Sequence, residues 1–395
     1  MSFPAIFQWL VSAVTSPHSK IRGLSALLQA SSRNPKKDDY HRQQKNIINL
    51  LKGSSYTIPR LEKCLEGWYM GVNPAYEKIK AGEGEFLREY VELMLHNLGD
   101  TNLTAFSIRR WIERDNLREM AVKVDLSLCI ACFFPRTTEE KLQVLFEKMA
   151  WVYVDSFLTS EEFVRQDPAA FVKYWLDPNR SGPEPYVLPS CIIYRTVGPK
   201  LAVGWSKESK AQFQKTTVEY IDCLMEVSKQ REKYLPSLEE YIEGRIINIG
   251  VYPTLDLIPY AANIEVSDEV LRHESVQTIR WHIVRIICLM NDIFSVKKEI
   301  KDCQFDNIIP LLLVHKGMSV QAAVDYTVGL IEESYRIVNA AGARLPKLDG
   351  KAKEDLDTYI EQCKDQAAGS IYFHQYSPRY LPRSAFQGDK IVVQL

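Results

Sequence analysis

The sequence predicts an all-helical protein in which a single bundle of helices surrounds a central cavity. Apolar residues recur at helical spacing along most of the chain, and strand-like alternation is scarce. Short segments that contain Pro, Gly or Asn separate the helical stretches. Helices connected in this way pack into bundles whose interior can hold a ligand.

The helical segments follow a polar beginning. We interpret residues 1–45 as an N-terminal segment or arm, because residues 16–45 are largely polar and basic. This arm is either a solvated loop or a segment that orders over a bound anion. Ser237 with Glu240 forms a capping box, and Thr137 precedes two glutamates of a first turn, so both mark helix starts. The predicted helices are 85–98, 137–158, 206–231, 237–249, 269–302, 319–341 and 351–376.

Length and charge narrow the class of function. With 395 residues, 46% of them hydrophobic, the chain can build a large core, and we interpret residues 46–395 as one domain. A formal net charge of -1 creates no positive field for nucleic acid, so a small anionic ligand fits better. No uncharged apolar run reaches the roughly 20 residues of a bilayer span, so we expect no stable membrane insertion.

The cysteines and the N-terminus indicate the compartment. The 8 cysteines are scattered through mostly apolar helical patterns, which favours a reducing cytoplasm over a disulfide scaffold. The first 15 residues lack a basic leader and a small-residue cleavage site. Cys129 and Cys132 have the spacing of half a zinc or redox motif, but no second pair follows them. We therefore interpret these two as core cysteines of a cytoplasmic protein.

One segment carries the strongest chemical pattern. Asn291, Ser295 and Glu299 are four residues apart, so on a helix they share an arc of about 80°. They present an amide, a hydroxyl and a carboxylate, an oxygen-only set suited to a hard cation such as Mg²⁺. Lys298 projects from nearly the same face and can meet an anion that the metal brings in. Spacing alone leaves two interpretations open, a metal site and the solvated side of a helix.

This segment resembles the second metal-binding motif of class I terpene cyclases. In that motif Asn or Asp, then Ser or Thr, then Glu hold one Mg²⁺ against the substrate diphosphate. Asn291, Ser295 and Glu299 match it position for position, and a Lys before the last Glu occurs in microbial members. The resemblance extends over residues 137–380 and is closest to fungal sesquiterpene cyclases. It implies the single-domain class I terpenoid synthase fold.

A second match lies upstream of the metal motif. Arg245 precedes Asn291 by 46 positions, near the end of a predicted helix that breaks at Asn248-Ile249-Gly250. A plain interpretation is a cation that favours the C-terminal end of the helix dipole. In the family, an Arg at about this separation resembles the diphosphate sensor, with a linker and an effector residue at the break. By this resemblance Asn248 is the linker and Ile249 the effector.

A third match follows the last predicted helix. Arg379 and Tyr380 come directly after an aromatic helix end, where the family carries an Arg-Tyr pair that donates hydrogen bonds to diphosphate. Arg offers a planar fork of donors and Tyr adds a neutral one. The resemblance therefore implies that Arg245, Lys298, Arg379 and Tyr380 surround the diphosphate.

One motif departs from the family. Class I cyclases normally carry several acidic residues at the end of a helix, and here only the first, Asp155, is present. The resemblance implies that Asp155 bridges metal ions, with Glu161 or Glu162 as outer support. Alternatively, Glu162 completes a capping box with Thr159. This departure is the sequence feature that favours a non-catalytic alternative.

Aromatic residues complete the predicted site. Tyr153, Phe157 and Phe373 either belong to the core or line the cavity, where ring faces stabilise cations. The resemblance implies three Mg²⁺ ions and a linear prenyl diphosphate substrate, farnesyl diphosphate before a C10 or C20 homologue, which is cyclised with release of diphosphate. Two alternatives stay open: a non-catalytic helical binding or scaffold protein, and a prenyl diphosphate chain-elongating synthase. Since dimers are common in the family, a homodimer is a further expectation.

Overall fold

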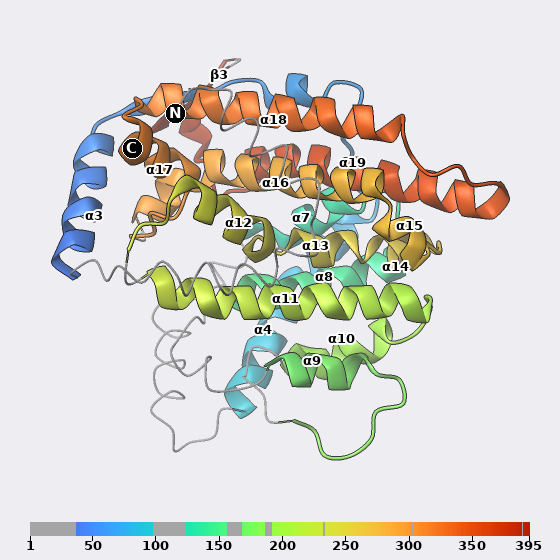
Figure 1. The fold of residues 1–395 in the computed structure, drawn as a ribbon. Helices are drawn as coiled ribbons and strands as arrows, with labels where there is room; N and C mark the ends of the chain where they lie inside the picture. The colour runs from blue at the N-terminus through green and yellow to red at the C-terminus, as the bar shows by residue number, and fades with distance from the viewer. Residues whose placement is uncertain are drawn as a thin grey trace.

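The fold is a layered assembly of helices (Figure 1). In the view of Figure 1, α18 (Val320–Gly342), α16 (Glu274–Lys301) and α11 (Lys207–Arg231) run across the molecule one below another. The predicted all-helical fold is confirmed. The computed structural model describes residues 37–97, 124–155, 168–185, 192–231, 234–301, 303–388 and 390–395.

Helix α16 lies at the centre of the packing. It packs along α18 on one side and along α19 (Gly350–Tyr376) on another. Nearly all residues from Ser275 to Val296 are buried, because this stretch is apolar around most of its circumference. The segment that carries the predicted metal motif therefore belongs to the core.

A short apolar helix, α7 (Leu126–Phe133), lies against α19 and is buried along its whole length. The two helices approach closely at Gly369, where an added Cβ would lie 2.1 Å from the Cys132 carbonyl oxygen. Only glycine permits that approach. Cys129 and Cys132 are both buried in the core, as the sequence predicted.

The helices on the other side of the bundle are α4 and α8 to α11. Helix α8 begins at Glu139, two residues later than predicted. The reason is that Thr137 donates its hydroxyl to the Ala261 carbonyl at 2.8 Å, while the Thr138 hydroxyl accepts from the Lys141 amide at 3.5 Å. The bounds are α4 Tyr76–Asn97, α8 Glu139–Asp155, α9 Pro168–Leu176 and α10 Tyr194–Leu201.

A break separates α12 (Leu238–Asn248) from α13 (Val251–Leu255). The capping box of Ser237 and Glu240 opens α12 as predicted. Gly250 then adopts a φ of 74°, a left-handed conformation that suits glycine and turns the chain into α13. The predicted helix break near Asn248 is therefore confirmed.

The predicted helix 269–302 is interrupted. The structure divides it into α15 (Asp268–Arg272) and α16, with the extended residue His273 between them. The His273 ring accepts from the Ser275 amide at 3.3 Å and so helps to open α16. Helix α14 (Ile258–Ala262) precedes this pair.

The predicted N-terminal loop ends earlier than expected, because α3 (Lys37–Leu51) begins inside it. Its buried side chains, Tyr40, Ile47 and Leu51, recur on one helical face among the charges. Helix α17 (Ile308–Lys316) and the short 3-10 helices η1 (Leu61–Leu65) and η4 (Arg383–Ala385) complete the described helices.

A small antiparallel sheet was missed by the sequence analysis. Its strand order is β1 (Ser55–Ile58), β3 (Lys390–Gln394), β2 (Phe386–Gln387). Tyr56 pairs with Val393, and both are buried. The Tyr56 hydroxyl donates to the Ile293 carbonyl of α16 at 2.7 Å, so the sheet supports the central helix.

No single helix within the described ranges is long and apolar enough to cross a membrane. Helices α17 and α18 meet that criterion only as a pair, and a bend of 115° separates them.

Candidate active site

The predicted metal motif lies on one face of α16. Ser295 is 2% exposed, and its hydroxyl has no hydrogen-bond partner among the described residues. Asn291 and Glu299, one turn to either side, are partly exposed. A buried hydroxyl without a partner is costly unless something binds it, so this observation favours the metal site over a solvated helix face.

Asn291 brings three predicted residues together. Its Oδ1 accepts from the Arg245 guanidinium at 2.6 Å, and its Nδ2 donates to the Tyr380 hydroxyl at 3.2 Å. Arg245 lies 46 positions before Asn291 and Tyr380 lies 89 positions after it. The fold thus collects side chains from α12, α16 and the segment after α19 into one hydrogen-bonded group.

His374, which the sequence analysis did not select, fixes the orientation of the Asn291 amide. Its Nδ1 lies 2.6 Å from the Ser370 carbonyl, which can only accept, so Nδ1 carries the proton. Burial lowers the pKa of His374 to about 4, and the nearby Arg379 and Arg245 also lower it. The neutral ring therefore accepts through Nε2 from Asn291 Nδ2 at 3.0 Å. Asn291 Oδ1 is consequently directed away from His374.

Asp292 is a second residue that sequence reasoning missed. It is 1% exposed and forms an ion pair with Arg245, whose guanidinium lies 3.1 Å from Oδ1. The Tyr241 hydroxyl and the Ile308 amide also donate to this carboxylate. Burial raises the pKa of Asp292, whereas the Arg245 charge lowers it. This network holds the Arg245 side chain beside Asn291.

Glu299 accepts a hydrogen bond from a buried residue outside the motif. Asn307, at the N-terminus of α17, donates from Nδ2 to Glu299 Oε2 at 2.8 Å. Lys298 is the neighbour of Glu299 and is partly exposed.

The helix break contributes a further contact. Asn248 Oδ1 accepts from the Arg245 Nη1 at 3.2 Å, so the predicted linker contacts the predicted sensor. Ile249 is the C-cap residue of α12 and packs against the core.

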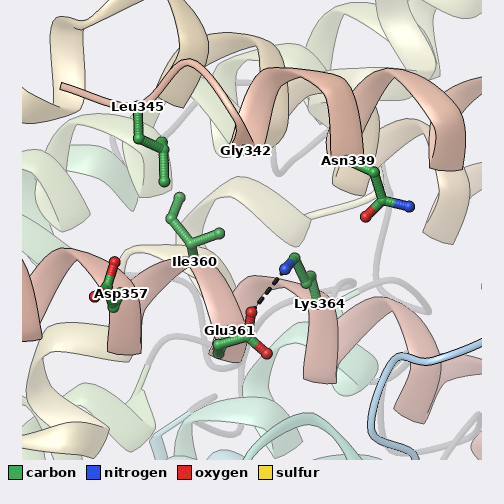
Figure 2. Close-up of a pocket in the computed structure, with 7 residues that line it drawn as sticks. All are labelled: Asn339, Gly342, Leu345, Asp357, Ile360, Glu361 and Lys364. Atoms are coloured by element: carbon green, nitrogen blue, oxygen red, sulfur yellow. Dashed lines mark hydrogen bonds and ion pairs between the residues drawn. The ribbon is translucent and has the colours of Figure 1, made fainter.

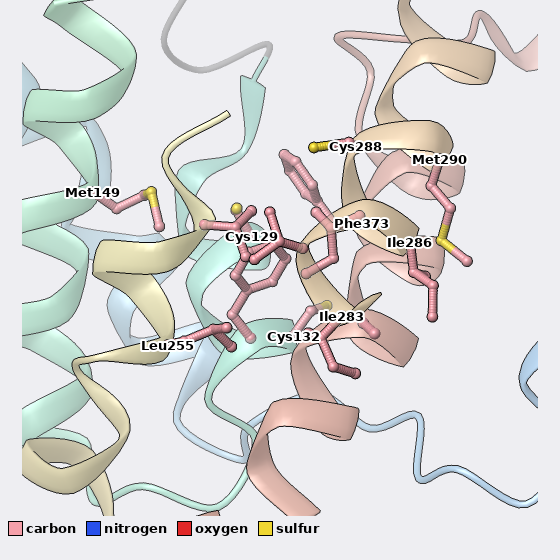
Figure 3. Packing of buried hydrophobic residues seen from close by; sticks show 14 of the residues in the cluster. Cys129, Cys132, Met149, Leu255, Ile283, Ile286, Cys288, Met290 and Phe373 are labelled. Carbon is pink, nitrogen blue, oxygen red and sulfur yellow. The ribbon is translucent and has the colours of Figure 1, made fainter. Parts of the chain in front are cut away.

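Arg379, Tyr380 and Phe373 lie close together. The Arg379 guanidinium carbon is 5.8 Å from the Tyr380 ring centre, and the Tyr380 ring meets the Phe373 ring edge-on at 5.8 Å. Tyr380 is buried, and Arg379 is partly exposed. Phe373 is 1% exposed and lies among buried apolar side chains that include Cys129 and Cys288 (Figure 3). Within the described residues it is therefore part of the core.

Some predicted residues cannot be placed in this group. Asp155 is the last residue of α8, but its side chain and that of Tyr153 lie outside the described part of the structure. Phe157, Glu161 and Glu162 also lie outside it. Elsewhere in the described ranges, no three His, Cys, Asp or Glu side chains gather as a metal site. The roles predicted for these five residues stay predictions.

Two described surface pockets lie away from the site. The first, between α18 and α19, has a volume of about 300 Å³ and contains an ion pair between Lys364 and Glu361 (Figure 2). The second, of about 470 Å³, is bordered by α4, α8 and α10. Neither contains a predicted site residue. The linings are Asn339, Gly342, Leu345, Asp357, Ile360, Glu361 and Lys364 for the first, and Lys78, Ile79, Glu139, Glu140, Gln143, Val144 and Lys200 for the second.

A known family model matches the part of the chain that contains most of this group of residues. Residues 152–336 match the model of terpene synthase family 2, C-terminal metal binding. That range includes Arg245, Asn291, Ser295 and Glu299, and it ends before Arg379.

The similar sequences cover more of the chain. The chain is 23% identical to terpene cyclase braA of Annulohypoxylon truncatum, over 87% of this chain and 90% of that protein. It is 25% identical to (+)-eremophilene synthase of Gibberella fujikuroi, over 81% of this chain and 86% of the relative.

These matches support a fungal class I terpene cyclase. Solved structures support the corresponding fold. Hedycaryol synthase aligns with a TM-score of 0.63 at 18% identity, over 81% of this chain and 99% of that one. An α-eudesmol synthase aligns with a TM-score of 0.64 at 18% identity, over 79% and 98%. The matches together support cyclisation of a prenyl diphosphate, and the family model supports metal binding by residues 152–336.

Proposed function

We propose that this cyclase ionises farnesyl diphosphate with the help of Mg²⁺ and closes the carbocation into a cyclic sesquiterpene hydrocarbon or alcohol, releasing diphosphate. One observation carries the proposal: Arg245, Asn291 and Tyr380, from three distant segments, form one hydrogen-bonded group. This group combines a cation, a metal-ligand type and a neutral donor, which are the functions that a diphosphate site needs.

The residues present fit a magnesium ion. Ser295 contributes a buried hydroxyl that has no partner in the described part of the chain, between the amide of Asn291 and the carboxylate of Glu299. Such oxygen ligands suit Mg²⁺. We propose that these three residues hold one ion and that Asp155 contributes to the binding of two more. When bound, Mg²⁺ offsets the negative charge that develops on the departing diphosphate.

The cationic residues bind and orient the diphosphate. Arg245 is held by Asp292 and Asn248 on two sides, so its guanidinium is oriented before an anion arrives. Oriented donors stabilise developing charge without reorganising during the reaction. In our proposal Lys298, Arg379 and Tyr380 supply the remaining donors, and Ile249 is the effector at the helix break.

Apolar side chains protect the cation after ionisation. An apolar wall excludes water, and aromatic ring faces stabilise positive charge without forming a bond to it. Tyr153 and Phe157 are proposed for this wall. Phe373 is buried beside Tyr380, so it supports the wall from the core.

The proposal is tested by incubating the full chain with farnesyl diphosphate, with and without Mg²⁺, and analysing the products by gas chromatography and mass spectrometry. We expect a cyclic C15 product only in the presence of metal. Geranyl and geranylgeranyl diphosphates in parallel assays test the substrate length. Glu299→Ala should abolish turnover, because it removes a metal ligand, while Glu354→Ala on an exposed turn of α19 is the matched control.

The two alternatives predict other outcomes. A chain-elongating synthase would yield a longer prenyl diphosphate when isopentenyl diphosphate is added. A non-catalytic protein would leave all three substrates intact, and the lone Asp155 would then explain the loss. The treatment of residues 46–395 as one domain, the cytoplasmic location and the homodimer stay predictions.

A further inference from the structure

We propose that Asn307 is a positioning residue that orients the carboxylate of Glu299 for metal binding. The inference rests on the metal-dependent function proposed above. Asn307 is 0% exposed, and it is the N-cap residue of α17, eight positions after Glu299. It belongs to none of the motifs that the sequence analysis selected.

The side-chain amide of Asn307 uses both of its ends. Nδ2 donates to Glu299 Oε2 at 2.8 Å and to the Asp292 carbonyl oxygen at 3.0 Å. Oδ1 accepts from the Ile309 amide at 2.9 Å, which caps α17. Two donated bonds and one accepted bond fix the amide plane and leave no alternative orientation of the group.

The contact with Glu299 is one-sided. Asn307 donates to Oε2, so Glu299 would offer its other oxygen, Oε1, to a bound ion. Carboxylates that bind metals are usually held by such outer hydrogen bonds, and loss of the partner weakens metal affinity about 10- to 100-fold.

The first turn of α17 also holds the other half of the site. The Ile308 amide donates to the Asp292 carboxylate at 3.1 Å, and Asp292 in turn pairs with Arg245. The chain therefore uses adjacent residues, Asn307 and Ile308, to support the metal-binding side and the diphosphate-binding side of α16.

A purely structural cap would not require asparagine. Ser, Asp and Asn all cap helices well through a side-chain acceptor. Among these, only Asn also donates two N–H bonds in the geometry seen here. The contact with Glu299 accounts for that additional chemistry.

The test compares Asn307→Ser, which retains a capping hydroxyl, with Ser319→Ala, which removes the cap of α18 away from the site. Thermal unfolding is measured while Mg²⁺ is titrated in the presence of inorganic diphosphate, and the Mg²⁺ concentration for half-maximal stabilisation is extracted. Turnover of farnesyl diphosphate at the same Mg²⁺ concentrations is the second measurement. We expect Asn307→Ser to raise the half-maximal concentration at least about 10-fold. Ser319→Ala should lower the unfolding temperature without changing that concentration.

A second comparison tests whether Asn307 acts through Glu299. In protein that already carries Glu299→Ala, Asn307→Ser should cause no further rise in the half-maximal Mg²⁺ concentration, because the partner of Asn307 is gone. If Asn307→Ser does not fold, the isosteric Asn307→Asp keeps the capping acceptor and removes both donors, and the same rise is expected. An unchanged Mg²⁺ requirement in these variants would overturn the positioning role. Wild-type protein that Mg²⁺ and diphosphate stabilise, but that forms no terpene, would contradict the proposed cyclisation alone. Wild-type protein that they do not stabilise would overturn both.

Discussion

Two buried histidines on neighbouring central helices differ in their hydrogen bonds, and this difference predicts opposite results for the same substitution. His374 on α19 donates to Ser370 and accepts from Asn291. Neither ring nitrogen of His282 on α16 has a partner among the described residues. His374 is 3% exposed and His282 is 2% exposed. Each ring contacts an aromatic neighbour, Phe294 for His374 and Trp281 for His282. Phenylalanine preserves these ring contacts and removes only the polar atoms.

The expected magnitudes follow from the lost bonds. His374→Phe removes two hydrogen bonds, each worth about 1 kcal/mol net, and deprives the Asn291 amide of an acceptor, so we expect a loss of about 2–3 kcal/mol. His282→Phe removes two buried polar atoms that make no hydrogen bond to a described residue, so we expect stability to change by less than about 1 kcal/mol or to rise. Any cost of the larger ring is shared by the two variants.

Urea-induced unfolding at pH 7 measures both differences. A functional readout accompanies it, because His374→Phe also removes one of the three hydrogen bonds that orient the Asn291 amide. The Mg²⁺ concentration for half-maximal turnover should then rise by about 10-fold in His374→Phe and stay unchanged in His282→Phe. Equal losses of stability in the two variants, or an equal Mg²⁺ requirement, would refute the assignment of the Asn291 orientation to His374.

Two further predictions concern pH and packing. Burial lowers the pKa of His282 to about 3, so between pH 6.5 and 3 the unfolded chain binds a proton there that the folded chain does not, and stability falls as pH falls. His282→Phe should remove about 1.4 kcal/mol per pH unit of that loss between pH 6 and 5. Asp292 makes an opposing contribution, which cancels when the stability of wild type and of His282→Phe is compared at each pH. Identical slopes of stability against pH in the two proteins would contradict the prediction. Gly369→Ala should destabilise the fold by more than about 1–3 kcal/mol, because the new Cβ would lie 2.1 Å from the Cys132 carbonyl oxygen. Gly329→Ala on α18 should stabilise the fold by about 0.5–1 kcal/mol, because the added Cβ would meet no described atom within 4 Å beyond its own helix backbone. If thermal unfolding ranks the two variants in the other order, the packing argument is wrong.

Most of the helical fold could be predicted because it depends on local patterns. The amphipathic helices α11, α12, α18 and α19 begin and end within two residues of their predicted limits. Helix α7 was missed because it is apolar on all sides and has no periodicity. The sheet was missed because its strands are short and because β1 pairs with β3 from the opposite end of the chain. Such pairing leaves no local signal.

The site could be predicted only where motif spacing identified residues directly. Asn291, Arg245 and Tyr380 were chosen from the resemblance, and the structure brings them into contact. Asp292 had a usable signal, since it is an acid between the buried Met290 and Ile293 in a helix with an apolar interior face. His374 and Asn307 offered none. His374 contacts Asn291 across 83 positions, and Asn307 contacts Glu299 across the end of α16, where no helical period applies.

The supporting contacts explain how a site can persist while most of the sequence changes. Tyr380 reaches Asn291 because the chain turns after α19 at Ser377, whose hydroxyl donates to the Val124 carbonyl beside α7 at 2.6 Å. Arg245 reaches it because α12 ends at a glycine with a positive φ, and because the buried Asp292 holds the guanidinium. These contacts depend on backbone geometry and on a few buried polar groups, and they do not depend on the residues of the exposed surface. A chain that is 23–25% identical to its relatives can therefore keep the hydrogen-bonded group of Arg245, Asn291 and Tyr380 while the sequence around it differs.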